Sequence, residues 1–332
     1  MNASVSTIAC SFPPSVTQRV LWQEFFHHHF GGDRRAQRIW TRCGVERRHG
    51  AVDPRVEDLR QAGTARRMRR FVDEALPLGK QAVTACLDQA GLCPEQVEHF
   101  TVVTCTGYAS PGLDTQLARD LGMSPRVERL QIGHMGCYAA LPALAGIADS
   151  VRARGITAVL LCLELTSVHV QPPSAEIDQM VAHALFSDAA AAVVVQPDAA
   201  GLTIVDVAAR TDFSRAHLMT WDVTDLGFRM GLSPDIPDVL ARHVRTTVPE
   251  LLTRHGLSVA DVAGWAIHPA GPVSSMSCKT SSGWKPVKRR PPRRCCASMG
   301  TAPPPPSWLC CSVSPPRCRS ADTSWRWRSG PD

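Results

Sequence analysis

Short apolar runs alternate with longer amphipathic stretches over the first 270 residues. The apolar runs are rich in Val, Ile, Leu and Ala and too short for helices, so they predict buried strands. These strands are expected at residues 5–12, 99–106, 129–132, 156–165, 189–197, 202–212 and 261–269. Helices are expected over 71–90, over 115–122, and from Cys137 to the glycine at 155. Alternation of helices with wholly apolar strands predicts an α/β fold whose sheets are covered on both faces.

Charge is unevenly distributed, and this limits what the net charge of +6 means. The 60 residues after Pro272 carry 11 Lys and Arg and only 2 Asp and Glu, whereas residues 1–272 carry 25 and 28. The basic character therefore belongs to the C-terminal segment. It gives no reason to expect nucleic-acid binding by the body of the protein.

The cysteines of residues 1–272 are scattered singly, without a CxxC pair or metal-ligand spacing. We therefore expect free thiols, a reducing cytoplasmic compartment and no bound metal or cofactor. The N-terminal residues do not resemble a signal peptide, and no apolar run is long enough to span a membrane. Three consecutive histidines at 27–29 point in different directions, which favours an exposed helix or loop over a metal site.

The stretch GHMGCYAALPAL (133–144) combines a glycine-flanked turn with the start of a nearly uncharged helix. Gly136 permits a tight backbone there, and Cys137 follows it at the head of the helix. A helix N-terminus favours negative charge, which is expected to lower the cysteine pKa and stabilise the thiolate. Cys137 is therefore a candidate nucleophile, with a buried structural cysteine as the alternative.

A candidate partner for this thiol lies in WAIHPAGP (265–272). His268 directly follows an apolar run and stands at a Pro/Gly turn, where its ring can face a pocket. A surface-turn histidine is the alternative interpretation.

Taken in order and spacing, several motifs resemble those of the type III polyketide synthases, the chalcone synthase-like branch of the thiolase superfamily. The similarity extends over about residues 5–272. The stretches that carry it are GVERRH (44–49), VVTCTGYASPGLD (102–114), HMGCYAA (134–140), LLCLELTSVH (160–169), ALFSDAAAAVVV (184–195), LGFRMGLSPDIP (226–237) and WAIHPAGP (265–272). Ketoacyl carrier-protein synthases III are the nearest competing relatives, but their histidine motif usually differs from HPxGP.

The resemblance implies roles for particular residues. Cys137 matches the nucleophile and His268 the histidine of a Cys–His–Asn triad. Phe186 and Phe228 match two phenylalanines that separate the CoA tunnel from the reaction cavity, with core packing as the alternative. Arg47 and Arg48 are candidate contacts for CoA phosphates or an exposed basic pair. Ala189 departs from the family, which usually has glycine there, and its methyl group is expected to crowd the backbone beneath Phe186.

The triad asparagine is missing. It should follow His268 in a segment like YGNxSSAT, yet residues 273–332 contain no asparagine. Reading the C-terminal segment one base earlier makes SMGTAPPPPSWLCC (298–311) compatible with YGNCSSATVLAVL. The glycine and the last leucine of that sequence are forced, as are a leucine from Cys295–Cys296 and a glutamate from Trp284–Lys285. We therefore expect a net loss of one base, or a gain of two, shortly after codon 272. A natural basic, disordered, partner-binding tail is the alternative.

The sequence thus predicts a layered αβαβα thiolase-like fold of two similar halves, the second incomplete. Residues 1–200 form the first half with the nucleophile, residues 201–272 begin the second, and residues 273–332 are out of frame. The implied activity is condensation of an acyl-CoA starter with malonyl-CoA, impaired by the lost asparagine, in a homodimer without nucleic-acid or membrane partners. The alternatives are a ketoacyl synthase III-like enzyme and a non-enzymatic paralogue that binds a partner through its tail.

Overall fold

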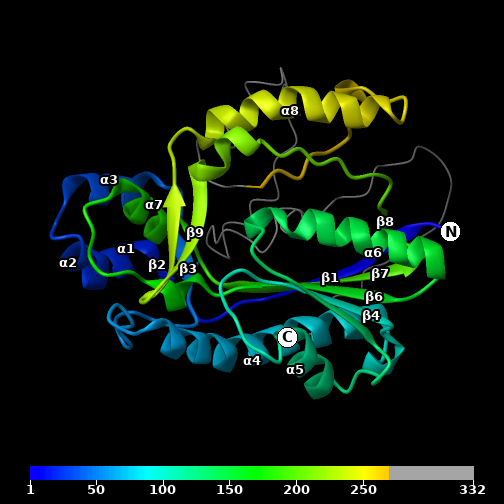
Figure 1. Cartoon of the computed structure of the whole chain (residues 1–332), viewed down its shortest axis with the longest axis horizontal. Helices are drawn as coiled ribbons and strands as arrows, with labels where there is room; N and C mark the ends of the chain where they lie inside the picture. Colours follow the sequence, from blue (N-terminus) through cyan, green and yellow to red (C-terminus); the bar gives the residue numbers. More distant parts are fainter. Residues whose placement is uncertain (269–332) are drawn as a thin grey trace, which may run out of the picture.

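A computed structural model describes residues 1–268 of the 332-residue chain (Figure 1). The predictions made for residues 273–332, the shifted reading frame among them, lie outside the described residues. None of the helices in the described part is long and apolar enough to cross a membrane.

A mixed six-stranded sheet forms the centre of the molecule, with strand order β5-β4-β6-β7-β1-β8. β4 runs parallel to both β5 and β6, whereas β6–β7, β7–β1 and β1–β8 are antiparallel. The strands are β1 (Ala3–Ser11), β4 (His99–Val103), β5 (Glu128–Ile132), β6 (Ala158–Glu164), β7 (Ala189–Pro197) and β8 (Leu202–Thr203). β6 and β7 are almost wholly buried because helices cover both faces, as their continuous apolar runs predict.

The two faces of the sheet carry separate cores. α4 (Thr64–Ala90) and α5 (Leu113–Leu121) cover one face, and α6 (Ala140–Arg154) covers the other (Figure 1). α4 ends at Gly91 and α6 at Gly155, both in the left-handed conformation, as predicted from the glycine stops. α4 can approach the sheet closely at Gly79, because a Cβ there would lie 3.1–3.3 Å from three leucine side chains.

A third cluster lies beside one end of the sheet and is rich in aromatic residues. The elements in and around this cluster are β2 (Ser15–Thr17), α1 (Gln18–Leu21), η1 (Trp22–Phe26), α2 (His27–His29), α3 (Arg34–Arg42), β3 (Arg47–His49) and α7 (Ile177–Leu185). Buried Trp40 of α3 is 2% exposed and helps to join α3 to this cluster. His27 and His28 are exposed, but His29 is buried, so the predicted exposed position is wrong for His29. No group of potential metal ligands occurs among residues 1–268.

The last described elements lie over this cluster and above α6. They are the hairpin of β9 (Met219–Thr224) and β10 (Gly227–Leu232), the helix α8 (Ile236–Thr253), and the short helical turns η5 (Phe213–Leu218) and η6 (Val259–Asp261). Three other short turns connect elements of the central part: η2 (Pro94–Gln96), η3 (Gly136–Tyr138) and η4 (Thr166–His169). The strand predicted over 202–212 is confirmed only for β8, since just Leu202 and Thr203 find partners on β1. The strand predicted over 261–269 is not formed in its described part, 261–268, which has no strand partner there.

Candidate active site

Cys137 lies in the turn η3, directly before the buried helix α6. Gly136 adopts a left-handed φ of +63°, and His134 one of +62°, so the chain reverses sharply between β5 and α6. Cys137 is exposed at the surface of this turn. The predicted strand–turn–helix position of the candidate nucleophile is therefore confirmed.

The pKa of Cys137 is raised, which contradicts the expected lowering by the helix N-terminus. Although the residue as a whole is exposed, loss of water around its sulfur is the largest cause of the shift, and the nearby Glu164 carboxylate adds to it. A hydrogen bond from the residue's own backbone opposes the shift. The thiol therefore needs a base to reach its nucleophilic form at neutral pH.

Glu164 ends β6 and holds the segment opposite the nucleophile. Its carboxylate accepts hydrogen bonds from the backbone nitrogens of Cys105 and Thr106, both at 3.0 Å, and from the Thr106 hydroxyl at 2.6 Å. Burial raises the pKa of Glu164, whereas these hydrogen bonds lower it. Sequence reasoning missed this residue, although a carboxylate that ends an apolar strand is a signal for a functional or positioning role.

His268 is the last described residue and is partly buried. Its Nδ1 atom is buried without a hydrogen-bond partner, and burial lowers its pKa. No hydrogen bond joins His268 to Cys137 within residues 1–268. The catalytic pairing of these two residues stays a prediction.

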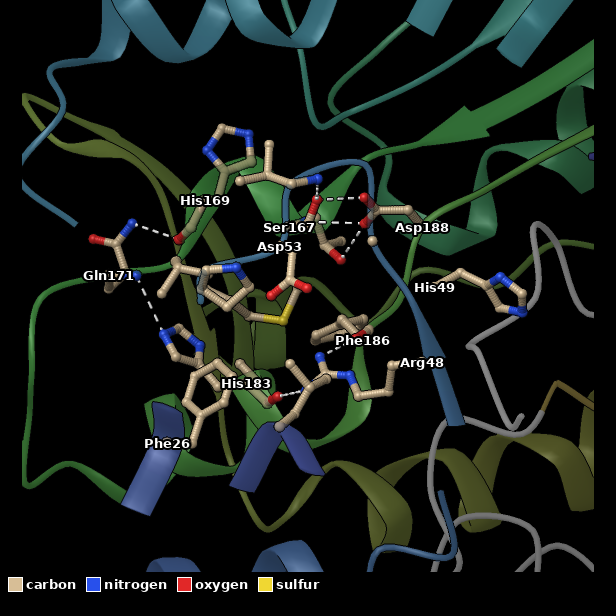
Figure 2. Close-up of a pocket in the computed structure, with 18 of the residues that line it drawn as sticks. Phe26, Arg48, His49, Asp53, Ser167, His169, Gln171, His183, Phe186 and Asp188 are labelled. Carbon is tan, nitrogen blue, oxygen red and sulfur yellow. Dashed lines mark hydrogen bonds between the residues drawn. The ribbon is translucent and has the colours of Figure 1, made fainter. Parts of the chain in front are cut away.

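Phe186 and Phe228 line one cavity of about 110 Å³ (Figure 2). It lies between the aromatic cluster and the β9–β10 hairpin, and Trp221, His169 and Ser167 also line it. Phe186 follows α7 directly and Phe228 lies on β10, so distant segments bring the two phenylalanines together. Trp221 connects the cavity wall to the segment that Glu164 holds, because its indole donates to the Cys105 carbonyl at 2.7 Å.

Arg47 and Arg48 both direct their hydrogen bonds to the protein. Arg47 donates to the Ser15 hydroxyl at 2.7 Å. The guanidinium of Arg48 donates to the carbonyls of His183 and Phe186 (Figure 2). It also lies 5.2 Å from the Trp40 ring centroid, and burial lowers its pKa to about 10. Arg48 thus holds the backbone of Phe186 in place, and a contact of either arginine with CoA phosphates stays a prediction.

Asp188 fixes the loops around the cavity. It accepts hydrogen bonds from the backbone nitrogens of Ala51, at 2.8 Å, and Ser167, at 2.9 Å. Burial raises the pKa of Asp188, although those bonds oppose the shift. The next residue, Ala189, pairs with Glu164 in the regular β6–β7 ladder, so its methyl group is accommodated within the sheet.

A mixed sheet between helices, with a cysteine at the head of a buried helix, matches the thiolase-like fold. Comparison with known proteins defines the class further. Residues 46–199 match the family of chalcone and stilbene synthases, N-terminal domain. The chain belongs to the type III polyketide synthase family.

Two characterised relatives illustrate the range of this similarity. An alpha-pyrone synthesis polyketide synthase-like protein of Mycobacterium tuberculosis is 31% identical over 73% of this chain and 65% of its own length. A 1,3,6,8-tetrahydroxynaphthalene synthase of Streptomyces peucetius is 33% identical over 73% of this chain and 66% of its own length. The chain thus spans slightly less than two thirds of the relatives it matches.

Solved structures agree with this assignment. PKS-I from the brown alga Ectocarpus siliculosus superposes with a TM-score of 0.78 at 26% identity, covering 86% of this chain and 81% of that one. The C-terminal type III polyketide synthase domain of Steely1 from Dictyostelium has a TM-score of 0.82 at 23% identity, covering 93% and 90%. At 23% identity, the similarity to the Steely1 domain shows a shared fold and nothing further.

Proposed function

We propose that this chain loads an acyl group from acyl-CoA onto Cys137 and, in its complete form, extends it with malonyl-CoA. The observation that carries the proposal is the position of Cys137 in the turn that leads into α6, close enough to Glu164 for the carboxylate to raise its pKa. The names of the relatives support it, since they describe syntheses of a pyrone, a tetrahydroxynaphthalene and 3,5-dihydroxyphenylacetyl-CoA.

The proposed chemistry has two stages. His268 removes the proton from Cys137, the sulfur attacks the acyl thioester, and CoA leaves as a thiol. Malonyl-CoA then loses carbon dioxide, and its carbanion attacks the acyl carbonyl on Cys137. A carbon–carbon bond forms and the sulfur leaves as thiolate. An asparagine donor would stabilise the enolate oxygen. The segment after His268 contains no asparagine that could do so.

We propose further that residues 1–200 are the first half of the fold and that residues 201–272 begin the second. The family match, which ends at residue 199, supports this boundary. A shifted reading frame over 273–332 explains the missing asparagine and the abrupt change in charge. A homodimer in the cytoplasm completes the proposal, supported by the family and by the seven free cysteines of the described residues.

Acyl transfer to Cys137 tests the proposal directly. The full chain incubated with hexanoyl-CoA should gain the mass of one hexanoyl group, located on Cys137 by peptide mass spectrometry. Cys137→Ala should abolish the adduct, whereas Cys93→Ala should retain it, because Cys93 is an exposed cysteine away from this turn. Loading that persists in Cys137→Ala, or no loading with any acyl-CoA, would contradict the proposal.

A row of arginines on α3 is the best candidate for the CoA phosphates. Arg34, Arg38 and Arg42 recur every four residues, are exposed, and form no ion pair within residues 1–268. The buried side of α3 carries Trp40, which packs against Arg48 at the cavity wall. An exposed basic row at this position can attract a phosphate-rich ligand toward the cavity.

Charge reversal should expose this role. The triple variant Arg34→Glu, Arg38→Glu, Arg42→Glu is expected to weaken CoA binding by roughly tenfold or more at low salt, with a smaller difference at high salt. Calorimetric titration with CoA at two salt concentrations measures the effect. Arg126→Glu on another surface is the control. Equal affinities of the triple variant and the control would assign the phosphates elsewhere.

A further inference from the structure

Two cysteines come close together beyond the ends of β4 and β5. The two strands pair in parallel over their whole length, and the contact continues past them, because the Thr104 backbone N–H donates to the Ile132 carbonyl at 3.1 Å. A Cβ on Gly133 would lie 3.5 Å from the Thr104 carbonyl oxygen. Cys105 follows one of these adjacent segments, and the turn that carries Cys137 follows the other.

The thiol of Cys105 is held at this junction by Glu164. It donates to a Glu164 carboxylate oxygen at 3.2 Å, and the same oxygen accepts the Cys105 backbone N–H at 3.0 Å. Burial and the Glu164 carboxylate raise the pKa of Cys105, and the nearby backbone N–H of Gly136 opposes the increase. The Cys105 sulfur is therefore a neighbour of the residue directly before Cys137.

The thiols of Cys105 and Cys137 also interact with each other electrostatically. Burial is the largest cause of the raised pKa at both cysteines, and the Glu164 carboxylate acts on both. A negative charge on Cys137 raises the pKa of Cys105 further, which requires the two sulfur atoms to be near one another. Cys137 is exposed and Cys105 is half-buried, so a small oxidant can reach the first and the second can respond to it.

We infer that Cys105 and Cys137 form a redox site, in which a peroxide oxidises Cys137 and Cys105 then closes an intramolecular disulfide. The inference goes beyond acyl loading and does not rest on it, since the disulfide needs no CoA thioester. The disulfide would reversibly remove the sulfur that accepts the acyl group. It would also protect that sulfur from irreversible oxidation to sulfinic acid.

The chemistry balances in two steps with hydrogen peroxide as the oxidant. The Cys137 sulfur first attacks a peroxide oxygen, the O–O bond breaks, and the products are Cys137 sulfenic acid and water. The Cys105 sulfur then attacks the Cys137 sulfur, the S–O bond breaks, and hydroxide leaves. Glu164 takes the Cys105 proton and passes it to the hydroxide, which forms a second water. The two electrons that reduce the peroxide come from the two thiols.

Peptide mapping of the oxidised full chain tests the pair. Replacing the six cysteines of residues 273–332 by serine gives a background with seven cysteines, all of them free thiols in the structure. After treatment with hydrogen peroxide, the peptides joined through Cys105 and Cys137 should exceed every other linked pair by about tenfold or more, because neighbouring groups react at a high effective concentration. Oxidation in urea should abolish this preference, because unfolding separates the two thiols.

Cys105→Ser is the matched variant. Its hydroxyl can keep the hydrogen bond to Glu164 but cannot form a disulfide. Cys137 should therefore become sulfinic acid on prolonged oxidation, and dithiothreitol should recover about tenfold less Cys137 thiol than in the background. Cys93→Ala removes an exposed cysteine elsewhere and should behave as the background does.

Each result supports or overturns the inference. Absence of the Cys105–Cys137 link in the folded background, or a link from Cys137 to another cysteine or another chain, would overturn it. Equal recovery of Cys137 thiol in Cys105→Ser and the background would do the same. If a melting curve shows that Cys105→Ser does not fold, the peptide map of the background decides. A chain that forms the disulfide but accepts no hexanoyl group would refute only the proposed function.

Discussion

Inserting one base shortly after codon 272 should raise malonyl-dependent product formation by roughly 10²–10³-fold. The expected gain reflects return of the asparagine, since one oxyanion donor is typically worth that much in rate. It also reflects return of the strands that should complete the second half of the fold. Turnover of radiolabelled malonyl-CoA with a hexanoyl-CoA starter measures the change, and the unmodified chain is assayed in parallel.

A matched control separates the asparagine from the rest of the restored segment. The frame-restored gene in which the new asparagine codon is changed to an alanine codon should fold equally well but lose the gain in extension. Acyl loading of Cys137 should survive in that control, because loading needs the thiol and its base. Equal malonyl turnover by the chain as written and the frame-restored protein would refute the shifted frame as the cause of impairment.

The central elements could be predicted because their sequences have a single consistent interpretation. The Ala/Val run at 189–197 matches β7, and the glycine stops at 91 and 155 end their helices. The start of α4 was predicted seven residues too late, because its first turns are rich in arginine and look exposed. Arg67 is nevertheless fully buried, with its guanidinium satisfied by backbone carbonyls that no local pattern reveals.

The candidate site could be predicted only where chemistry coincides with a local motif. Cys137 lies in a recognisable glycine turn, and Phe186 and Phe228 lie in motifs of the family. Glu164 and His169 take their importance from partners about 60 residues away, Thr106 among them. The raised pKa of Cys137 was also beyond prediction, because it depends chiefly on how folding removes water from the sulfur and only secondarily on the nearby Glu164 carboxylate.

Burial of histidines should cause the second large effect, a loss of stability in acid. Three histidines, His29, His169 and His183, are held neutral, with pKa values lowered by burial to about 4, 4 and 3. Nearby groups add to the lowering: Arg60 at His29, where Asp58 opposes it, and first His29 and then Arg48 at His183. Their ordinary pKa of 6.5 applies once the chain unfolds, so the unfolded chain binds more protons below that value.

Because of this difference in proton binding, the free energy of unfolding decreases as the pH falls. Stability from the neutral histidines is complete above pH 6.5 and is lost as pH falls from there toward 4 and 3. At pH 5 each histidine should reduce the free energy of unfolding by about 2 kcal/mol. The raised pKa values of Glu164 and Asp188 act in the opposite direction, since protonation of these buried carboxyls at low pH relieves their desolvation. The net loss should therefore be smaller than the histidines alone would give.

His29 allows the effect to be isolated, because neither of its buried ring nitrogens has a hydrogen-bond partner within the described residues. His29→Leu should therefore remove a titrating group without breaking a hydrogen bond. Urea unfolding at pH 7 and pH 5, on the chain as written and on the frame-restored protein, should show a loss between the two pH values that is smaller by about 2 kcal/mol in this variant. His28→Leu, at the exposed neighbouring position, should keep the full loss. If His29→Leu loses as much stability as the unmodified protein, the acid sensitivity does not arise from this buried ring, and the burial of His29 among Phe25, Phe26 and Phe30 is of no consequence for titration.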